Sequence, residues 1–467
     1  MAEKKNLWTT YKKTDLTQLN KLAEAYKAFL STGKTERRFV TQSIDAAEKA
    51  GFRNLDQLIA KKTTLKKGDK FYAALMGKSL ILGIIGKTPM EAGMNILGAH
   101  VDSPRLDLKQ VPLYEDTELA FLDTHYYGGV KKYQWVTTPL ALYGVIAKKD
   151  GTVIDVAIGD DDSDPVFCFT DLLIHLSAKQ LEKRASVVIE GEALDLLFGS
   201  CPAPTKKGEK EQKEAVKAGV LAILAEKYGI EEDDFLSAEI EVVPAGKARD
   251  CGIDRSMILG YGHDDRVCAY TSLAAILDQT GTPERTSLCL LVDKEEIGSV
   301  GATGMESRFF ENTVAEVMEL TGESSGIALR RCLANSFMLS SDVSAAYDPL
   351  YASVYEKRNC AYFGKGIVFN KYTGSRGKSG SNDASAEYMA KIRQIMDDGN
   401  VGFQTAELGK VDAGGGGTIA YIAGNYGMNV IDSGVAVLSM HAPWEVVSKS
   451  DVFEAYKCYK TFLATMK

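Results

Sequence analysis

The sequence lacks the features that mark exported, membrane or nucleic-acid-binding proteins. No segment has the long uncharged apolar run of a membrane helix, and the amino terminus has no apolar signal-peptide core. The net charge of −8 makes nucleic acid an unfavourable partner. The eight cysteines are scattered without a CxxC pair, and several lie inside apolar runs, as Cys289 does. We therefore expect buried free thiols in a reducing compartment, the cytoplasm.

The pattern of the chain changes twice along its 467 residues. Strand-like and helix-like segments alternate over 1–105 and again over 247–467. Between these parts, residues 106–246 contain short strand-like runs such as 153–158 and 186–189. The sequence therefore predicts one α/β domain, formed by 1–105 and 247–467, that is interrupted by an inserted, largely β domain.

Apolar spacing and turn residues predict the individual elements. Helices are expected over 14–31, 41–50, 218–228, 264–278, 307–320, 383–396 and 451–466. Strands are expected over 71–75, 79–85, 94–98, 134–146, 286–292, 336–340, 428–431 and 435–440. The stretch 364–381 is rich in glycine and basic residues, which is typical of a mobile loop.

Two adjacent glutamates, Glu295 and Glu296, follow the apolar run 286–292. In open α/β sheets, ligands bind beyond the carboxyl ends of the strands. Neighbouring side chains of an extended segment point to opposite sides, so one carboxylate could bind a metal while the other faces substrate or water. An isolated Glu-Glu pair is more often a solvated acidic turn. Whether this pair is a site or a surface turn therefore depends on the other candidate ligands in the sequence.

Further candidate ligands lie where predicted strands end or a helix begins. They are His100, Asp264, Asp342 and His441. Asp102 follows His100 by two residues and can accept the free imidazole N–H, which fixes the tautomer. Two imidazoles and three carboxylates suit two divalent cations of zinc type, with one further carboxylate as general base. The residues alone do not decide which glutamate does which job.

Five segments resemble those of co-catalytic zinc aminopeptidases, in particular the aspartyl aminopeptidase and aminopeptidase I family. They are Gly98-Ala-His-Val-Asp-Ser-Pro104, His263-Asp-Asp-Arg266, Asp293-Lys-Glu-Glu-Ile-Gly-Ser299, Ser340-Ser-Asp-Val343 and Met440-His-Ala442. The resemblance covers nearly the whole chain. It implies a three-layer zinc-peptidase domain that removes amino-terminal residues from short peptides with a free N-terminus.

The resemblance also assigns roles to the candidate residues. The metal ligands would be His100, Asp264 as the bridge, Glu296, Asp342 and His441. Glu295 would be the general base, and Asp102 would orient His100. Two divalent ions are implied, zinc first, with manganese or cobalt as alternatives.

The same resemblance implies an assembly and a substrate site. Residues 106–246 would form a dimerisation domain, and dimers would assemble into a tetrahedral dodecamer. In relatives a histidine of that domain reaches the active site of the neighbouring subunit. His175 resembles that histidine, although a polar residue on an amphipathic helix is an equal interpretation. Gly417 ends the glycine run 414–417, which resembles the family's substrate-cradling loop.

One departure concerns the preferred first residue of the substrate. In aspartyl aminopeptidases the segment after the metal-binding Asp carries histidines, whereas the segment after Asp342 has none. A pocket for an acidic side chain needs positive or donor groups, which Lys371 and Arg376 could supply. A neutral or apolar first residue is therefore as open as an acidic one.

Three other functions remain open at this point. One is another two-metal amide hydrolase, such as a deacylase or a carboxypeptidase. Another is an inactive metal-bound assembly or cargo protein. The third is a nucleotide-binding α/β enzyme that uses the glycine run 414–417, although this run lacks the Gly-Lys-Ser/Thr ending of a P-loop.

Overall fold

The computed structural model describes residues 5–159, 161–204, 213–375 and 377–467. The chain divides into two compact units. Unit 1 comprises Met1–Ser103, Lys247–Met440 and Glu445–Lys467, and unit 2 comprises Pro104–Gly246 and His441–Trp444. None of the helices in the described ranges is both long and apolar enough to cross a bilayer.

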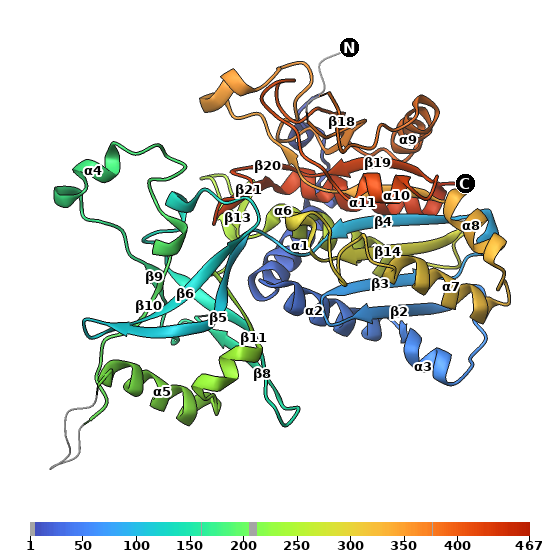
Figure 1. Ribbon diagram of the computed structural model, residues 1–467. Helices are drawn as coiled ribbons and strands as arrows, with labels where there is room; N and C mark the ends of the chain where they lie inside the picture. The colour runs from blue at the N-terminus through green and yellow to red at the C-terminus, as the bar shows by residue number, and fades with distance from the viewer. Residues whose placement is uncertain (1–4, 160, 205–212, 376) are drawn as a thin grey trace. The chain divides into compact units, whose positions relative to one another are not determined.

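Unit 1 is built on a mixed sheet that has nine strands within the described residues. In spatial order the strands are β1 (Arg53–Asn54), β2 (Lys70–Leu75), β3 (Ser79–Ile84), β14 (Thr286–Val292), β4 (Met94–His100), β15 (Phe337–Ser341), β19 (Asn429–Gly434), β17 (Ile367–Asn370) and β18 (Phe403–Thr405). The central strands β14, β4, β15 and β19 are parallel, so their carboxyl ends lie at one edge of the sheet (Figure 1).

Helices cover both faces of this sheet. One face packs against α1 (Lys13–Thr32), α2 (Glu36–Lys49), α6 (His263–Leu277), α9 (Ala386–Asp398) and α11 (Lys449–Thr465). The other packs against α3 (Leu55–Ala60), α7 (Phe309–Thr321), α8 (Gly326–Ala334) and α10 (Ala420–Gly424). Alternate β4 residues serve the two cores, because Leu97 belongs to the first and Ile96 to the second. The expected three-layer α/β architecture is confirmed.

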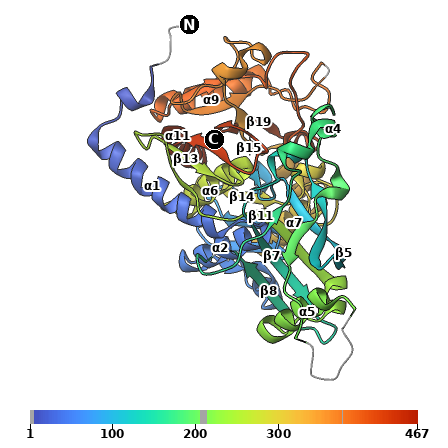
Figure 2. The ribbon, with the colours of Figure 1, turned by 90° about the vertical axis from the view of Figure 1, so that its left-hand side faces the viewer.

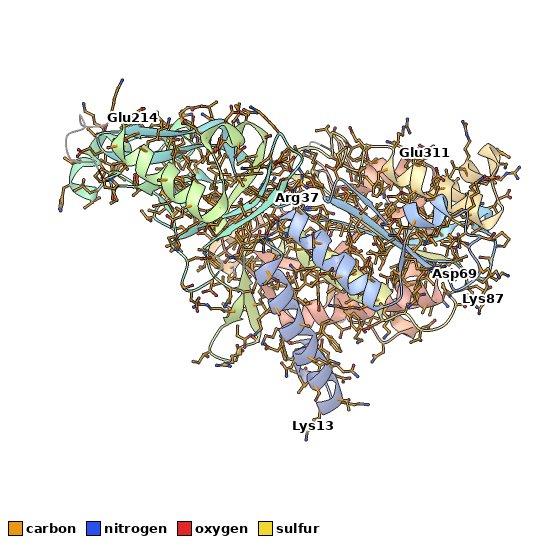
Figure 3. All side chains as sticks on the ribbon, turned by 90° about the horizontal axis from the view of Figure 1, so that it is seen from below. Lys13, Arg37, Asp69, Lys87, Glu214 and Glu311 are labelled. Carbon is orange, nitrogen blue, oxygen red and sulfur yellow. The ribbon has the colours of Figure 1, made fainter. Side chains whose placement is uncertain are left out.

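The long helix α1 lies beside α2, as Figure 2 and Figure 3 show in blue. Lys13 marks the start of α1, and Arg37 lies in the first turn of α2 (Figure 3). The prediction for 41–50 placed the start of the second helix too late. The helix begins at Glu36 because the Thr35 side chain caps it by accepting the Arg38 N–H.

A smaller sheet lies beside this core in unit 1. Its strands are β12 (Arg249–Cys251), β13 (Met257–Gly260), β21 (Glu445–Ser448), β20 (Ala436–Leu438) and β16 (Ser344–Ala345), in that order. The strand expected over 435–440 is therefore shorter and belongs to this sheet rather than to the central one.

Unit 2 contains an antiparallel sheet of seven strands within the described residues. In order they are β8 (Val153–Ile158), β7 (Leu140–Ala147), β11 (Ala238–Pro244), β5 (Arg105–Asp116), β6 (Leu119–Tyr127), β10 (Leu196–Gly199) and β9 (Cys168–Phe169). Helix α5 (Ala215–Tyr228) packs against β5, β6 and β10. Trp135 is fully buried in this unit. The largely β character expected for this part of the chain is what the structure shows.

Most of the strong apolar runs form the predicted elements, and three further predictions are wrong. The run 134–146 becomes a strand only at Leu140, after a short 3₁₀ helix, Lys132–Gln134. Residues 186–189 form no strand, because the backbone turns there, with the Val187 N–H bonded to Arg184 O. The expected loop 364–381 contains the buried strand β17, whose apolar residues pair with β18 and β19.

Candidate metal centre

Five of the six predicted acidic and imidazole residues meet at the carboxyl edge of the central sheet. His100 ends β4, Asp342 follows β15, and Glu295 and Glu296 follow β14 (Figure 1). Asp264 lies at the start of α6, which packs against β4. The parallel order of the three strands explains why residues so distant in sequence become neighbours.

His100 lies at the centre of this cluster. Its Nε2 is 3.2 Å from Asp264 Oδ1 and 3.9 Å from both Glu295 Oε2 and Asp342 Oδ1. One possible ligand atom from each of His100, Glu295 and Glu296 lies within 4.8 Å of the others. The predicted residues therefore form one compact group of nitrogen and oxygen donors.

The structure adds Asp265, which the sequence analysis did not select. His100, Asp265 and Asp342 also offer ligand atoms within 4.8 Å of one another, and Asp265 is fully buried. The available signal was the adjacent pair Asp264-Asp265.

A single buried residue, Asp102, contacts both halves of the cluster. His100 Nδ1 lies 3.1 Å from the backbone oxygen of Asp102, and the Asp102 carboxylate Oδ1 lies 3.3 Å from the same nitrogen. The Asp102 carboxylate has further partners. It also accepts the backbone N–H groups of Glu295 and Glu296, each at 3.2 Å. The predicted orientation of His100 by Asp102 fits this geometry, because an Nδ1–H that faces the carboxylate leaves Nε2 to bind a metal. The link to the two glutamates is a long-range contact that the sequence did not reveal.

The two glutamates lie on a turn, not on an extended segment as predicted. Lys294 has a left-handed backbone with φ 68°, and Glu295–Ile297 form a 3₁₀ helix. Both carboxylates therefore lie near His100. The expectation that the two side chains point to opposite sides of an extended strand does not apply. We call residues 294–304 the glutamate loop.

Asp264 is held by two backbone contacts. Its N–H donates to Glu445 Oε2 at 3.0 Å, and its carbonyl oxygen accepts the Ser103 hydroxyl at 2.5 Å. The side chain is thus left to face His100.

Burial and mutual repulsion make the cluster electrostatically unusual. Burial, followed by the charge of Glu295, raises the pKa of Asp342 well above its usual range. Burial also raises the pKa of Asp265. Although burial alone lowers it, hydrogen bonds to Asp102 and Asp264 raise the pKa of His100.

The donor set fits a divalent metal of zinc type. Buried carboxylates that repel one another are stabilised by a cation among them. His100 Nε2 is buried and faces the carboxylates of Asp264, Glu295 and Asp342 at 3.2 to 3.9 Å. An imidazole nitrogen and several carboxylate oxygens are ordinary zinc ligands.

The remaining predicted ligand, His441, directly follows Met440, where a range of unit 1 ends, and groups with unit 2. In unit 2 its Nδ1 lies 2.8 Å from Gly129 O. Its role as a ligand stays a prediction.

The predicted substrate residues lie on loops. In unit 1, Lys371 follows β17 and pairs with Asp383, and Gly417 is exposed at the end of the glycine run. The two loops join where the Gly374 N–H bonds to Gly416 O at 2.6 Å. Arg376 lies outside the described residues. The substrate roles stay predictions.

In unit 2, His175 lies in the exposed 3₁₀ helix Ile174–Leu176. The short helix α4 (Ala178–Leu181) follows directly after Ser177, and both interpretations of His175 stay predictions.

Comparisons with known proteins match nearly the whole chain. The family described as aminopeptidase I zinc metalloprotease (M18) matches residues 29–463. A probable M18 family aminopeptidase 1 of Clostridium acetobutylicum is 60% identical over 463 residues, which are 99% of this chain and 98% of that protein. The crystal structure of an M18 family aminopeptidase from Thermotoga maritima is 42% identical, with a TM-score of 0.94 over 100% of both chains. The yeast mApe1 dodecamer structure is similar in fold, with a TM-score of 0.74, 22% identity and coverage of 94% and 95%.

Proposed function

The chain belongs to the aminopeptidase I zinc metalloproteases of family M18, and from this membership we propose how its residues remove the first residue of a peptide. It is a metalloaminopeptidase that depends on zinc. Membership favours this activity over a deacylase, a nucleotide-binding enzyme or an inactive assembly protein.

We propose that the cluster holds two divalent ions, zinc in the first place. His100, Asp264, Glu296 and Asp342 would bind them with His441, and Asp264 would be shared. The support is the close approach of three carboxylates to His100 Nε2. They come from three separate segments of the chain, at Asp264, Glu295 and Asp342. When bound, two such ions polarise the scissile carbonyl and lower the pKa of a bound water.

Glu295 is the proposed general base. Its side chain is 16% exposed and its Oε2 lies 3.9 Å from His100 Nε2, so it borders the donor cluster while it stays open to a water molecule. It would take a proton from the water and pass it to the leaving amine. A positioned acid–base group typically accelerates such a step ~10²–10⁴-fold.

The proposed substrates are short peptides with a free amino terminus. A protonated or metal-bound amine is attracted to a site surrounded by carboxylates, whereas a blocked terminus is not. The ammonium group of Lys371 is already paired with Asp383, which also pairs with Lys378. We therefore expect neutral first residues to be accepted at least as well as acidic ones.

Assembly and location are further parts of the proposal. Unit 2 would mediate dimers that build a dodecamer, in which His175 would reach a neighbouring site. The support is a group of exposed apolar side chains around His175, namely Leu173, Ile174 and Leu176. All eight cysteines are free thiols, and five of them are buried, which fits a reducing compartment such as the cytoplasm.

The observation that carries the proposal is the buried His100 among carboxylates at the carboxyl edge of the sheet. The test uses metal-stripped protein reloaded with zinc, manganese or cobalt, and paired peptides that differ only in a free or an acetylated amino terminus. We expect mass spectrometry to show loss of one residue from the free peptide alone. Equal cleavage of the acetylated peptide, or cleavage at an internal bond, would contradict an aminopeptidase.

A further inference from the structure

The glutamate loop begins after the end of β14 and returns to lie directly beside it. We call the place where its two ends meet, at Asp293, Thr303 and Gly304, the neck of the loop. At the neck, the Asp293 N–H donates to Thr303 O at 3.3 Å, and Asp293 pairs with Gly304 in a β-bridge. The ten residues between Asp293 and Gly304 thus form a closed loop that carries Glu295 and Glu296.

A buried side-chain hydrogen bond closes the neck. The Thr303 hydroxyl donates to Asp293 Oδ2 at 2.6 Å, and both residues are buried. The Ser79 hydroxyl donates to Thr303 O, also at 2.6 Å, and Ser79 begins β3, the antiparallel neighbour of β14. The neck is therefore fastened to two strands of the central sheet.

The loop has little freedom to deform inside this neck. The Ser299 N–H bonds to Lys294 O at 2.6 Å, and the Gly298 N–H bonds to Glu295 O at 2.9 Å. A Cβ at Gly304 would lie 2.1 Å from Ser299 O, so the two arms of the loop touch. A shift at the neck is consequently passed on to the glutamates rather than absorbed.

Two sets of hydrogen bonds hold the glutamates in place, one to Asp102 and one at the neck, and the bond at the neck is the shorter. Asp102 accepts the Glu295 and Glu296 N–H groups at 3.2 Å each. The bond from Thr303 to Asp293 is 2.6 Å long and ends on a carboxylate. All three bonds end on carboxylates, and such charge-assisted bonds are roughly twice as strong as neutral ones.

We propose that Asp293 and Thr303 are positioning residues that set the place of the Glu295 carboxylate relative to His100. This inference rests on the proposed role of Glu295 as the general base. Neither side chain is among the donors around His100, so their effect passes through the loop. Because a displacement of about 1 Å in a catalytic group can cost ~10²-fold in rate, a modest loosening of the neck is measurable.

The test compares Thr303→Val, which keeps the shape and removes the hydroxyl, with Thr303→Ser, which keeps the hydroxyl. Thr286→Val is the matched control, because Thr286 is a buried threonine at the other end of β14, and its hydroxyl accepts the Gly86 N–H at 3.0 Å. On zinc-loaded protein and a free-amine peptide, we expect Thr303→Val to lower kcat roughly 10- to 100-fold. We expect KM and the zinc content to stay close to the parental values.

The other variants decide between positioning and mere stability. Thr303→Ser should recover most of the lost kcat, and Thr286→Val should keep the parental kcat even where it lowers the melting temperature. A kcat of Thr303→Val equal to that of Thr286→Val would overturn the inference, as would a loss of zinc from Thr303→Val. If Thr303→Val does not fold, Asp293→Asn is measured in its place. It should lower kcat by less than the 10- to 100-fold expected for Thr303→Val. A kcat equal to that of Thr286→Val, or a loss of zinc, would again overturn the inference. A parental enzyme without activity on the free-amine peptide would instead refute the proposed function.

Discussion

The two units depart from ordinary burial in opposite ways. In unit 1, His100, Asp102 and Asp264 are at most 3% exposed, although each is polar or charged. In unit 2, Leu173, Ile174 and Leu176 are 53%, 68% and 67% exposed, although each is apolar. Both arrangements cost free energy in an isolated chain, because buried charge loses solvation and exposed apolar surface orders water.

The difference indicates where each unit needs something from outside itself. A group of mutually repelling carboxylates needs a cation, and an apolar surface needs a protein partner. We therefore assign the chemistry to unit 1 and assembly to unit 2. The predictions that follow test this division.

Removal of the metal should have the largest effect, and it should be confined to unit 1. We expect a chelator to lower kcat by more than ~10³-fold, and zinc to restore it. Hydrogen exchange should become faster in β14 and the glutamate loop, because the carboxylates then repel one another without a cation. Exchange in β7 and β11 of unit 2 should stay the same. Full turnover by stripped protein, or equal loss of protection in both units, would contradict the division.

Asp102→Asn should have the next largest effect. The variant loses a carboxylate oxygen that accepts a backbone N–H, and it weakens the hold on His100. The loss of a residue that orients a metal ligand typically costs ~10–100-fold in metal affinity or activity. Asp107→Asn in unit 2 is the matched control, since Asp107 pairs with Arg105 in the antiparallel sheet. Zinc titration should separate the two variants, and equal affinities would refute the role of Asp102.

A buried acid of unit 1 far from the glutamate loop in sequence should make stability depend on pH. Burial raises the pKa of Asp451 to about 7, although the N–H groups of Gly366 and Gly364 lower it. The folded form then holds the proton more tightly than the unfolded form, whose ordinary value is 3.8. This residue's contribution to the free energy of unfolding is therefore greatest below about pH 4 and falls as the pH rises towards 7.

The measurement compares denaturant unfolding of the zinc-loaded parent and Asp451→Asn. The difference in their free energies of unfolding should shrink by about 2 kcal/mol between roughly pH 5 and pH 7.5, since each unit of pKa shift corresponds to ~1.4 kcal/mol. A difference that stays constant or grows with pH would refute this effect of Asp451.

The exposed apolar residues of unit 2 should give the smallest effect. Ile174→Asp should weaken self-association roughly tenfold, about 1.4 kcal/mol, because a charge replaces an apolar contact. Met76→Asp is the control, since Met76 is an exposed apolar residue of unit 1. Sedimentation velocity should show smaller species for Ile174→Asp alone. Identical profiles would argue against assembly through this surface.

The sequence predicts best what depends on local pattern. The run 286–292 forms a strand over the predicted residues, and the helices over 14–31 and 264–278 are confirmed within one residue at each end. These segments are long, strongly apolar and bounded by clear turn residues. The positions of His100 and Asp342 at strand ends follow from the same pattern.

What the sequence missed depends on backbone turns and long-range contacts. The left-handed Lys294 places the two glutamates on a 3₁₀ turn, and no local pattern marks that conformation in a lysine. The bonds from Glu295 and Glu296 to Asp102 span nearly two hundred residues of chain, as their sequence separations of 193 and 194 show. The run 186–189 is apolar enough for a strand but pairs with no strand among the described residues.

The most direct test of the account is the zinc content and turnover of Glu295→Gln and Glu296→Gln, measured side by side. Both residues lie on one turn and both N–H groups bind Asp102, so the two variants differ little except in which carboxylate is lost. We expect Glu295→Gln to keep its zinc and to lose ~10²–10⁴-fold in kcat, and Glu296→Gln to lose zinc. Parental turnover by Glu295→Gln, or full zinc in Glu296→Gln, would contradict the assignment of the base and the ligand.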